Sequence, residues 1–511
     1  MENKKSKLVA EDVAEINDLS QHPAVQKVRA QHFTKAAVES PFTIAVAGDI
    51  IQSNPIAQRQ NPEIRGILDV VKRSDIAIAN MESNFADYRN QPAYVGGLEG
   101  MKEVAQDVKD MGFDLVARAS NHSTDMGISE MFRSNKLLQE AGVVYAGTGI
   151  NLEDARAPQY FETPKGRVGM VAMCMSYSRC NNGSSSSACA GMEMASYQAG
   201  NMGGLPGINC LRVRPYLTIS KEKFAYLKAI KEEQQEFFEE SIIKAGEFNT
   251  SGRGEFGEAT HRRTQGKDVV TDDQIFLFGH WFKVGEDSCS QGFRMNPDDL
   301  RLNLRAIRDG KEWSDFMIAT IHSHDYNNIF PILDFLQQPP SDYLIELAHM
   351  AIDNGADMFV ATGPHILRGI EIYKGRPIFY SLASFVYQLW GTPAGPDRYT
   401  DNRLDWYYSE TTNTEMNMEA WPPLSITKHA DTSNMESMES ALAECKYENG
   451  LLTEIHMHPI EFGYDAPISQ RGIPRVPKPE VALRILKRLQ RLSEPFGTTI
   501  SIENNIGVIR L

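Results

Sequence analysis

The sequence predicts an α/β fold, a layered α/β sandwich, and two observations carry the prediction. Apolar segments of strand length alternate with amphipathic segments of helix length through most of the 511 residues. Five of the apolar segments end on Asp, Glu, Asn or His: TIAVAGDI, DIAIANMES, LVARASNHS, MIATIHSHD and MFVATGPHI. A sixth segment, PIFYSLASF, has the same form without an obvious ligand. Strands that are apolar throughout are typical of a sheet covered on both faces.

The first half of the chain alternates as such a fold requires. Residues 1–40 are charged and predict an N-terminal helical arm, and the core extends over 41–390. We expect strands at 43–48, 76–80, 115–120, 143–149 and 167–174 and helices at 64–75, 104–112 and 128–142.

The alternation fails over residues 177–300, which we interpret as an insertion that forms a lid or wall over the site. It contains the low-complexity segment NNGSSSSACAG and one long polar helix at 224–248. Its aromatic side chains are suited to packing on a substrate, and they are Phe276, Phe278, Trp281 and Phe282.

The alternation resumes in the second half with a helix at 302–316, a strand at 317–322, a helix at 343–355 and a strand at 358–363. A hairpin with Gly375 at its turn follows. In the C-terminal region, 391–511, we expect loops over 391–450, an exposed strand at 451–463 and a final helix at 479–497, all packed on the core.

Composition limits the possible partners. Hydrophobic residues make up 41% and charged residues 23%, as in ordinary globular proteins, and 52 basic against 67 acidic residues give a net charge of −15. This balance argues against a general nucleic-acid binder, which needs a basic surface. The six cysteines form no CxxC pair and predict reduced thiols. Because no apolar run has the length of a signal peptide or membrane span, we expect a cytoplasmic protein with no membrane anchor.

The polar strand ends predict a metal centre. Oxygen and imidazole ligands together suit zinc, manganese, iron or nickel, and we expect two such divalent ions. Glu82 can bridge the two ions, although a solvated loop charge is its simpler interpretation, and Asp49 can alternatively cap a helix. The predicted ligands are Asp49, Glu82, Asn121, His322, His324 and His365.

Three residues are candidates for the chemical step. His122 stands beside a predicted ligand, and Asp125 can orient its ring by accepting a hydrogen bond. His324 can transfer protons if His322 alone binds the ion. Three other histidines receive no metal role: His349 lies within a predicted helix, and His456 and His458 share one face of a predicted strand.

These segments resemble the CapA family of capsule-biosynthesis or poly-γ-glutamate synthesis proteins, which share the calcineurin-like metallophosphatase fold. The resemblance rests on Gly48-Asp49, Asn80-Met81-Glu82, Asn121-His122 with Asp125-Met126-Gly127, and the stretch IDNGADMFVATGPHILRGIEIYKGRPIFYSLASF. It covers residues 42–176 and 300–390. Two segments depart from the family pattern: Ile321-His322-Ser323-His324 replaces His-Trp-Gly, and Leu382-Ala383-Ser384 replaces Leu-Gly-Asn. The resemblance implies two central sheets with helices outside and ligands on strand-end loops.

The favoured function is metal-dependent hydrolysis of an amide or peptide-like bond of γ-glutamyl type, with a small-molecule or peptide-like substrate. An epimerase that uses facing histidines at Cα, a phosphoesterase, and a non-catalytic binding protein of a polymer-synthesis system remain alternatives. The sequence carries no signal of oligomeric state. Candidates for gripping a substrate carboxylate are Arg118, Arg156, Arg212, Arg368 and Arg471.

Overall fold

A computed structural model of the protein describes residues 36–87, 98–175, 193–198, 203–248, 273–277, 280–285, 290–325, 338–388, 435–463, 466 and 470–511. The segments predicted as the N-terminal arm and the serine-rich tract therefore fall outside the described residues, apart from 36–40. The same holds for 389–434, most of the predicted C-terminal loops, and for Phe278.

The larger of two central sheets has nine strands in the described part of the chain. Their order is β23-β24-β22-β21-β1-β2-β5-β6, and β20 pairs with β1 as well. β1, β2, β5 and β6 are parallel, as the alternation with helices predicted. The strands are β1 (Phe42–Ile51), β2 (Ile76–Met81), β5 (Leu115–Ala117), β6 (Val144–Ala146), β20 (Ser384–Tyr387), β21 (Glu439–Glu448), β22 (Leu451–Glu461), β23 (Ser501–Glu503) and β24 (Ile506–Arg510).

The second sheet has seven described strands in the order β11-β9-β16-β17-β19-β18, with β8 beside β9. The strands are β8 (Gln159–Thr163), β9 (Gly166–Met175), β11 (Cys210–Leu211), β16 (Phe316–His322), β17 (Met358–Thr362), β18 (Ile370–Tyr373) and β19 (Arg376–Phe379). One buried apolar cluster joins the facing sides of the two sheets, for example Val46 and Ile78 with Met170 and Ile318. This shared core explains why the strands are apolar on both faces.

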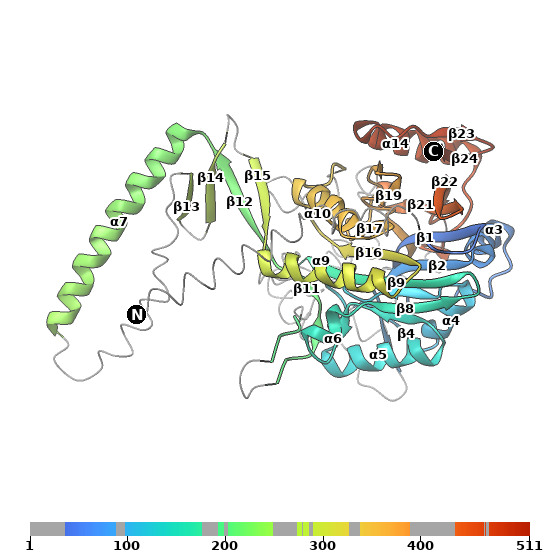
Figure 1. Cartoon of the computed structure of the whole chain (residues 1–511), viewed down its shortest axis with the longest axis horizontal. Coiled ribbons are helices and arrows are strands. Elements are labelled where there is room, and N and C mark those ends of the chain that lie inside the picture. The colour runs from blue at the N-terminus through green and yellow to red at the C-terminus, as the bar shows by residue number, and fades with distance from the viewer. Residues whose placement is uncertain are drawn as a thin grey trace, which may run out of the picture.

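Helices cover the two outer faces. On the larger sheet, Leu68 and Val108 join an apolar cluster with Ala45 of β1, and on the second sheet Ile307 and Leu347 join Ala319 of β16. These helices are α3 (Pro62–Arg73), α4 (Val104–Met111) and α5 (Ile128–Glu140) on the larger sheet and α9 (Pro297–Glu312) and α10 (Asp342–Asp353) on the second. The chain is thus a mixed α/β protein with parallel strands at the centre of both sheets, and Figure 1 shows the arrangement.

The C-terminal helix α14 (Pro479–Ser493) closes one end of the space between the sheets. It contacts β22 and β24 of the larger sheet and β18 of the second, and its Ile485 and Leu489 belong to the cluster between the sheets. The short elements are α6 (Leu152–Arg156), β3 (Asn84–Ala86), β4 (Glu99–Met101), β7 (Thr148–Gly149), β10 (Gly207–Ile208) and the 3-10 helices Met435–Met438 and Glu494–Phe496.

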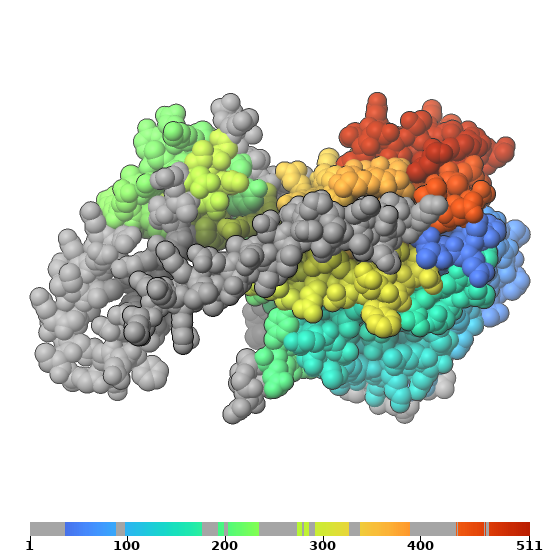
Figure 2. Space-filling model, in the orientation of Figure 1, coloured from blue at the N-terminus to red at the C-terminus, as the bar shows by residue number. Residues whose placement is uncertain are grey.

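The described part of the insertion forms a lobe beside the two sheets (Figures 1 and 2). Its four strands pair in the order β13-β14-β12-β15, and α7 packs on β13 and β14. The aromatic rings of Phe276 and Trp281 are 5.5 Å apart, and Phe276 is exposed. That this insertion forms a lid stays a prediction. The elements are α7 (Lys221–Phe248), β12 (Val213–Ile219), β13 (Gln274–Leu277), β14 (His280–Val284) and β15 (Ser290–Met295).

The C-terminal region differs from its predicted structure in two ways. β21 lies where loops were expected, and β22 is an interior strand, paired with both β21 and β24, instead of an exposed one. Charged residues such as Glu444 and Lys446 alternate with apolar ones in the second half of β21, which lies inside the sheet between β22 and β1. No helix in the described part of the chain is long and apolar enough to span a membrane.

Candidate metal centre

Asp49 lies near the carboxyl end of β1, where the register with β2 shifts. It stands opposite Asn80 of β2 and Ser384 of β20. The preceding Gly48 is required by a close approach of the chain, because a Cβ there would lie 1.8 Å from the carbonyl oxygen of Ala383. The three strands therefore bring their polar ends to one place.

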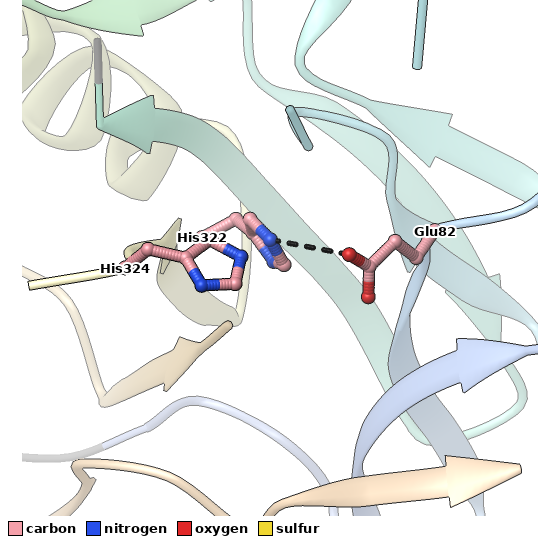
Figure 3. Close-up of side chains that lie close together, drawn as sticks. All are labelled: Glu82, His322 and His324. Atoms are coloured by element: carbon pink, nitrogen blue, oxygen red, sulfur yellow. Dashed lines mark ion pairs between the residues drawn. The ribbon is translucent and has the colours of Figure 1, made fainter. Parts of the chain in front are cut away.

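Glu82 and two histidines meet across the two sheets. Glu82 follows β2 of the larger sheet, whereas His322 ends β16 of the second, and Figure 3 shows the carboxylate facing the imidazole. His322 Nε2 lies 3.5 Å from Glu82 Oε1, and the ring of His324 lies 5.1 Å from that of His322. Ligand atoms of all three residues lie within 4.8 Å of one another.

A second group of ligands shares Glu82 with the first. Asp49, Glu82 and His365 also offer ligand atoms within 4.8 Å of one another, and His365 Nδ1 lies 3.1 Å from Asp49 Oδ2. The His365 ring lies 5.6 Å from that of His324, so the two groups are adjacent. We refer to Asp49, Glu82, His322, His324 and His365 as the strand-end cluster; all five are buried.

Burial and charge act on these groups in different directions. Burial opposes ionisation of Asp49, but hydrogen bonds and charge from His322 and His365 hold its pKa well below the usual range. Burial raises the pKa of Glu82 well above its usual value, and the charges of Asp49 and Asp125 add to the shift. Burial also lowers the pKa of His322 to about 4, against the attraction of Asp49. His322 therefore adds no positive charge to the cluster at neutral pH.

The buried polar atoms fit a bound cation. Among the described residues, neither carboxylate oxygen of Glu82 has a hydrogen-bond partner, and His322 Nε2 has none either. Buried charged groups are normally paired, hydrogen-bonded or bound to metal, because an uncompensated one is costly. A set of carboxylate oxygens and imidazole nitrogens suits zinc, manganese, iron or nickel. These residues can therefore hold divalent ions, with Glu82 between the two groups.

Two residues that the sequence did not single out as site residues orient the ligands. Asn80 Nδ2 donates to Asp49 Oδ1 at 2.8 Å and lies 3.1 Å from His322 Nδ1. Thr362 Oγ1 lies 2.9 Å from the same Nδ1, so Nε2 is the His322 atom that faces Glu82. Their position at strand ends is the signal by which they could have been found.

His122 and Asp125 lie together beside the cluster, as expected. His122 Nδ1 is 2.7 Å from Asp125 Oδ2, and His122 Nε2 is 3.9 Å from Glu82 Oε1. The Leu98 backbone N–H donates to Asp125 Oδ2 at 2.9 Å and fixes the carboxylate. Asn121 is buried one residue earlier in the same loop.

All five candidate arginines have protein partners. Arg118 donates to the Met81 and Ser83 carbonyls, Arg212 pairs with Asp299 at 2.7 Å, Arg368 with Asp325 at 2.7 Å, and Arg471 Nε donates to the Ala466 carbonyl at 2.6 Å. Arg156 differs: it is buried and donates to the Tyr197 hydroxyl, yet its Nε and Nη2 have no hydrogen-bond partner among the described residues. Arg368 Nε likewise has no partner among the described residues, so Arg156, with two such donors, and Arg368, with one, are the candidates with donors available for an anion.

Comparisons with known proteins point to one family. The sequence profile described as bacterial capsule synthesis protein PGA_cap matches residues 43–389. Two proteins of Sinorhizobium fredii (strain NBRC 101917 / NGR234), named uncharacterized protein y4sH and uncharacterized protein y4uA, are each 32% identical over 489 residues. These matches cover 94% of this chain and 95% of each relative.

Further similarity is partial. The PGA biosynthesis protein CapA of Bacillus subtilis (strain 168) is 31% identical over 119 residues, 23% of this chain and 27% of that protein. Among solved structures, a hypothetical protein from Thermus thermophilus aligns with a TM-score of 0.33 at 12% identity, over 82% of this chain and 99% of that one.

Proposed function

The chain belongs to the PGA_cap family of bacterial capsule synthesis proteins, and on that premise we propose that it is a metal-dependent hydrolase with a two-metal centre. The observation that carries the proposal is Glu82, which belongs to both ligand groups and has no hydrogen-bond partner for its carboxylate among the described residues. A fold of the calcineurin-like metallophosphatase type is part of the proposal. Two facing sheets with ligands at the carboxyl ends of parallel strands support it.

The proposed ligands divide between two positions. Asp49, Glu82 and His365 would hold one ion, and Glu82, His322 and His324 would hold the other. The amide oxygen of Asn121 is proposed as an additional ligand. Two divalent ions of zinc, manganese, iron or nickel would supply Lewis acidity and an activated water when bound. Asn80 and Thr362 keep the ligand rings and carboxylate in orientation.

Proton transfer falls to His122, with His324 as the second candidate. Asp125 holds His122 Nδ1, which leaves Nε2 directed toward the cluster, 3.9 Å from Glu82. A histidine in this position can give a proton to the leaving group as the bond breaks. Asp125 thus acts as a positioning residue for the His122 ring.

The proposed substrate is an amide of the γ-glutamyl type. The name of the Bacillus subtilis relative, PGA biosynthesis protein, points to such a polymer, and it supports the choice of an amide over a phosphoester. Because the net charge of −15 repels polyanions at long range, the site needs local positive charge. Arg156, which has buried donors without a partner among the described residues, is the proposed source of this charge.

The test is hydrolysis of γ-linked glutamate oligomers in water enriched in ¹⁸O. Protein supplied with Mn²⁺ or Zn²⁺ should cleave the amide and place one ¹⁸O in each new carboxylate, and Asp49→Asn should lose about a hundredfold or more in rate. His349→Ala is the matched control, because this histidine stacks on Tyr373 and contacts Glu371 on the second sheet. Binding of the oligomers without turnover would contradict the hydrolase and favour a binding protein.

The epimerase remains the second candidate because one specific feature favours it. His322, His324 and His365 form consecutive ring contacts at 5.1 and 5.6 Å, and two facing histidines can exchange a Cα proton. In deuterated water an epimerase would introduce deuterium at Cα without cleavage. A phosphoesterase would instead place ¹⁸O in the phosphate released from bis(p-nitrophenyl) phosphate.

A further inference from the structure

A second group of metal-ligating side chains lies on the β21–β22 hairpin. Glu444, His456 and His458, which we call the hairpin cluster, offer ligand atoms within 4.8 Å of one another. Glu444 pairs directly with His456 in the antiparallel ladder. Since side chains two residues apart on a strand share a face, His458 lies beside them on the side that Arg73 of α3 approaches.

We propose that the hairpin cluster binds one zinc ion, or a similar divalent cation, as a site separate from the strand-end cluster. Glu444 Oε2 lies 3.0 Å from His458 Nε2 and 3.8 Å from His456 Nδ1. Tetrahedral zinc, with bonds of about 2.0–2.1 Å, separates neighbouring ligand atoms by about 3.3 Å. The three atoms therefore surround a point where the ion fits after small side-chain shifts.

The surrounding residues orient the ligands as in known zinc sites. A zinc-bound histidine usually donates its other ring N–H to a carboxylate, and His456 Nε2 lies 3.0 Å from Glu454 Oε2. Arg73 binds both oxygens of Glu444 at 2.8 Å and fixes the plane of the carboxylate. Each carboxylate oxygen has two acceptor positions, so Glu444 Oε2 can bind an ion while it accepts from Arg73.

The charges around the cluster favour an ion over two protonated histidines. If His456 donates Nε2–H to Glu454, its Nδ1 lone pair faces Glu444 Oε2, and a cation between these two atoms would stabilise the contact. In the other tautomer Nε2 accepts from Lys446 and Nδ1–H is directed at Glu444. Protonating both rings would instead place two imidazolium ions beside Arg73 and Lys446, whose Nζ is 3.2 Å from His456 Nε2. One divalent ion could instead be coordinated by a nitrogen of each imidazole ring and by the carboxylate of Glu444.

The proposed ion would link the two strands of the hairpin, because Glu444 lies on β21 and both histidines lie on β22. Burial opposes ionisation of Glu444, but hydrogen bonds from His458 and Arg73 lower its pKa to about 2, so the ligand is charged at neutral pH. Lys446 and Glu454, which contact His456, also line a surface hollow of about 400 Å³. Water completes the coordination, because three protein ligands leave one tetrahedral position open.

The test is a zinc titration of the full chain by competition with a chromophoric chelator, followed by elemental analysis after dialysis. It includes the double variant Glu82→Gln with His322→Ala, which disables the strand-end cluster. This variant should retain one zinc per chain, and adding His458→Ala should remove it. If the strand-end cluster binds no metal and the hairpin cluster does, the unaltered protein should bind one zinc per chain, and His458→Ala should abolish that binding. This result would contradict the proposed function but not the hairpin site.

Two further variants keep the proposal falsifiable if His458→Ala does not fold. His458→Gln keeps a hydrogen-bond donor for Glu444 but not an imidazole ligand, and it should lose the zinc and the zinc-dependent rise in melting temperature. His349→Ala, a histidine substitution on the second sheet, should change neither. Zinc content and affinity that are the same in His456→Ala, His458→Gln and the unaltered protein would show that the cluster is an ion-paired network only, and would overturn the proposal.

Discussion

The strand-end cluster and the hairpin cluster contain the same kinds of side chain in opposite surroundings. Glu82 and Glu444 are both buried carboxylates that lie beside two histidines. No hydrogen bond reaches either oxygen of Glu82 within the described residues, whereas Glu444 accepts two hydrogen bonds from Arg73. Burial therefore raises the pKa of Glu82, while the pKa of Glu444 is lowered to about 2.

Because of this difference, an ionised Glu82 in the strand-end cluster needs a cation for charge compensation, whereas the hairpin cluster can bind a cation without requiring one. Within the described ranges, the ion-pair contacts of Glu82 are to histidines and not to an arginine or lysine, so its buried charge requires an ion for compensation. Glu444 is already compensated by Arg73, so an ion there adds stability without being required. Under the two proposals, the strand-end cluster would therefore serve function at a cost in stability, and the hairpin cluster would stabilise the sheet.

The largest expected effect concerns the arginines that support the two clusters. Arg368 and Asp325 form a fully buried pair next to His324, so Arg368→Met should lower the free energy of unfolding by about 3–5 kcal/mol. Arg73 is 54% exposed, so Arg73→Met should cost about 1 kcal/mol or less. Urea denaturation measures both. Adding Asp325→Leu to Arg368→Met should restore part of the loss, and equal effects of the two arginine substitutions would contradict the comparison.

The two glutamates should respond with opposite signs. Glu82→Gln should raise the unfolding free energy of the chelator-treated protein by about 1 kcal/mol, because it removes a buried charge without a hydrogen-bond partner. Glu444→Gln should lower it by about 1–2 kcal/mol, because it weakens charged hydrogen bonds to Arg73 and His458. Thermal unfolding of metal-free protein checks this. Destabilisation by both substitutions would remove the distinction between the clusters.

Turnover should separate the histidines of the two regions. His122→Ala should reduce the rate about a hundredfold while metal content is kept, because it removes a positioned proton donor. Asp125→Asn should cost about tenfold, because the ring loses its orientation. His458→Ala should leave the rate unchanged. The turnover rates are measured on γ-linked glutamate oligomers, and the metal content of each variant is analysed in parallel. Normal turnover in His122→Ala would exclude His122 from the chemical step.

The smallest effect concerns backbone strain at the strand-end cluster. Ala383 adopts φ of 61°, a conformation that costs residues with a Cβ about 1 kcal/mol but is free for glycine. Ala383→Gly should therefore raise the unfolding free energy by about 0.5 kcal/mol, after the added entropy of the unfolded chain is included. Ala443→Gly in the regular strand β21 is the matched control and should lower it by about 0.5–1 kcal/mol. Melting temperatures distinguish the two; a loss in both would show that Ala383 is not strained.

Much of the fold followed from local pattern. The apolar runs at residues 43–48 and 76–80 form β1 and β2, and Gly112 ends α4 with φ of 108°, as a glycine after an amphipathic helix predicts. β21 was not predicted because it belongs to the segment 391–450, which has little periodicity as a whole, and its pairing with β1 joins residues about 400 positions apart. Local pattern carries no information on such long-range pairing.

By itself the sequence determined the types of ligand and their places at strand ends, because strand period and side-chain chemistry are local properties. The tertiary structure alone decided how they meet: Glu82 faces His322 from the opposite sheet, and Arg118 and Arg368 are committed to protein partners. It also placed Arg73 of α3 against Glu444, and this ion pair distinguishes the hairpin cluster from the strand-end cluster. The physical reason is that burial and the neighbours of a charge depend on how sheets and helices pack, and packing joins residues distant in sequence.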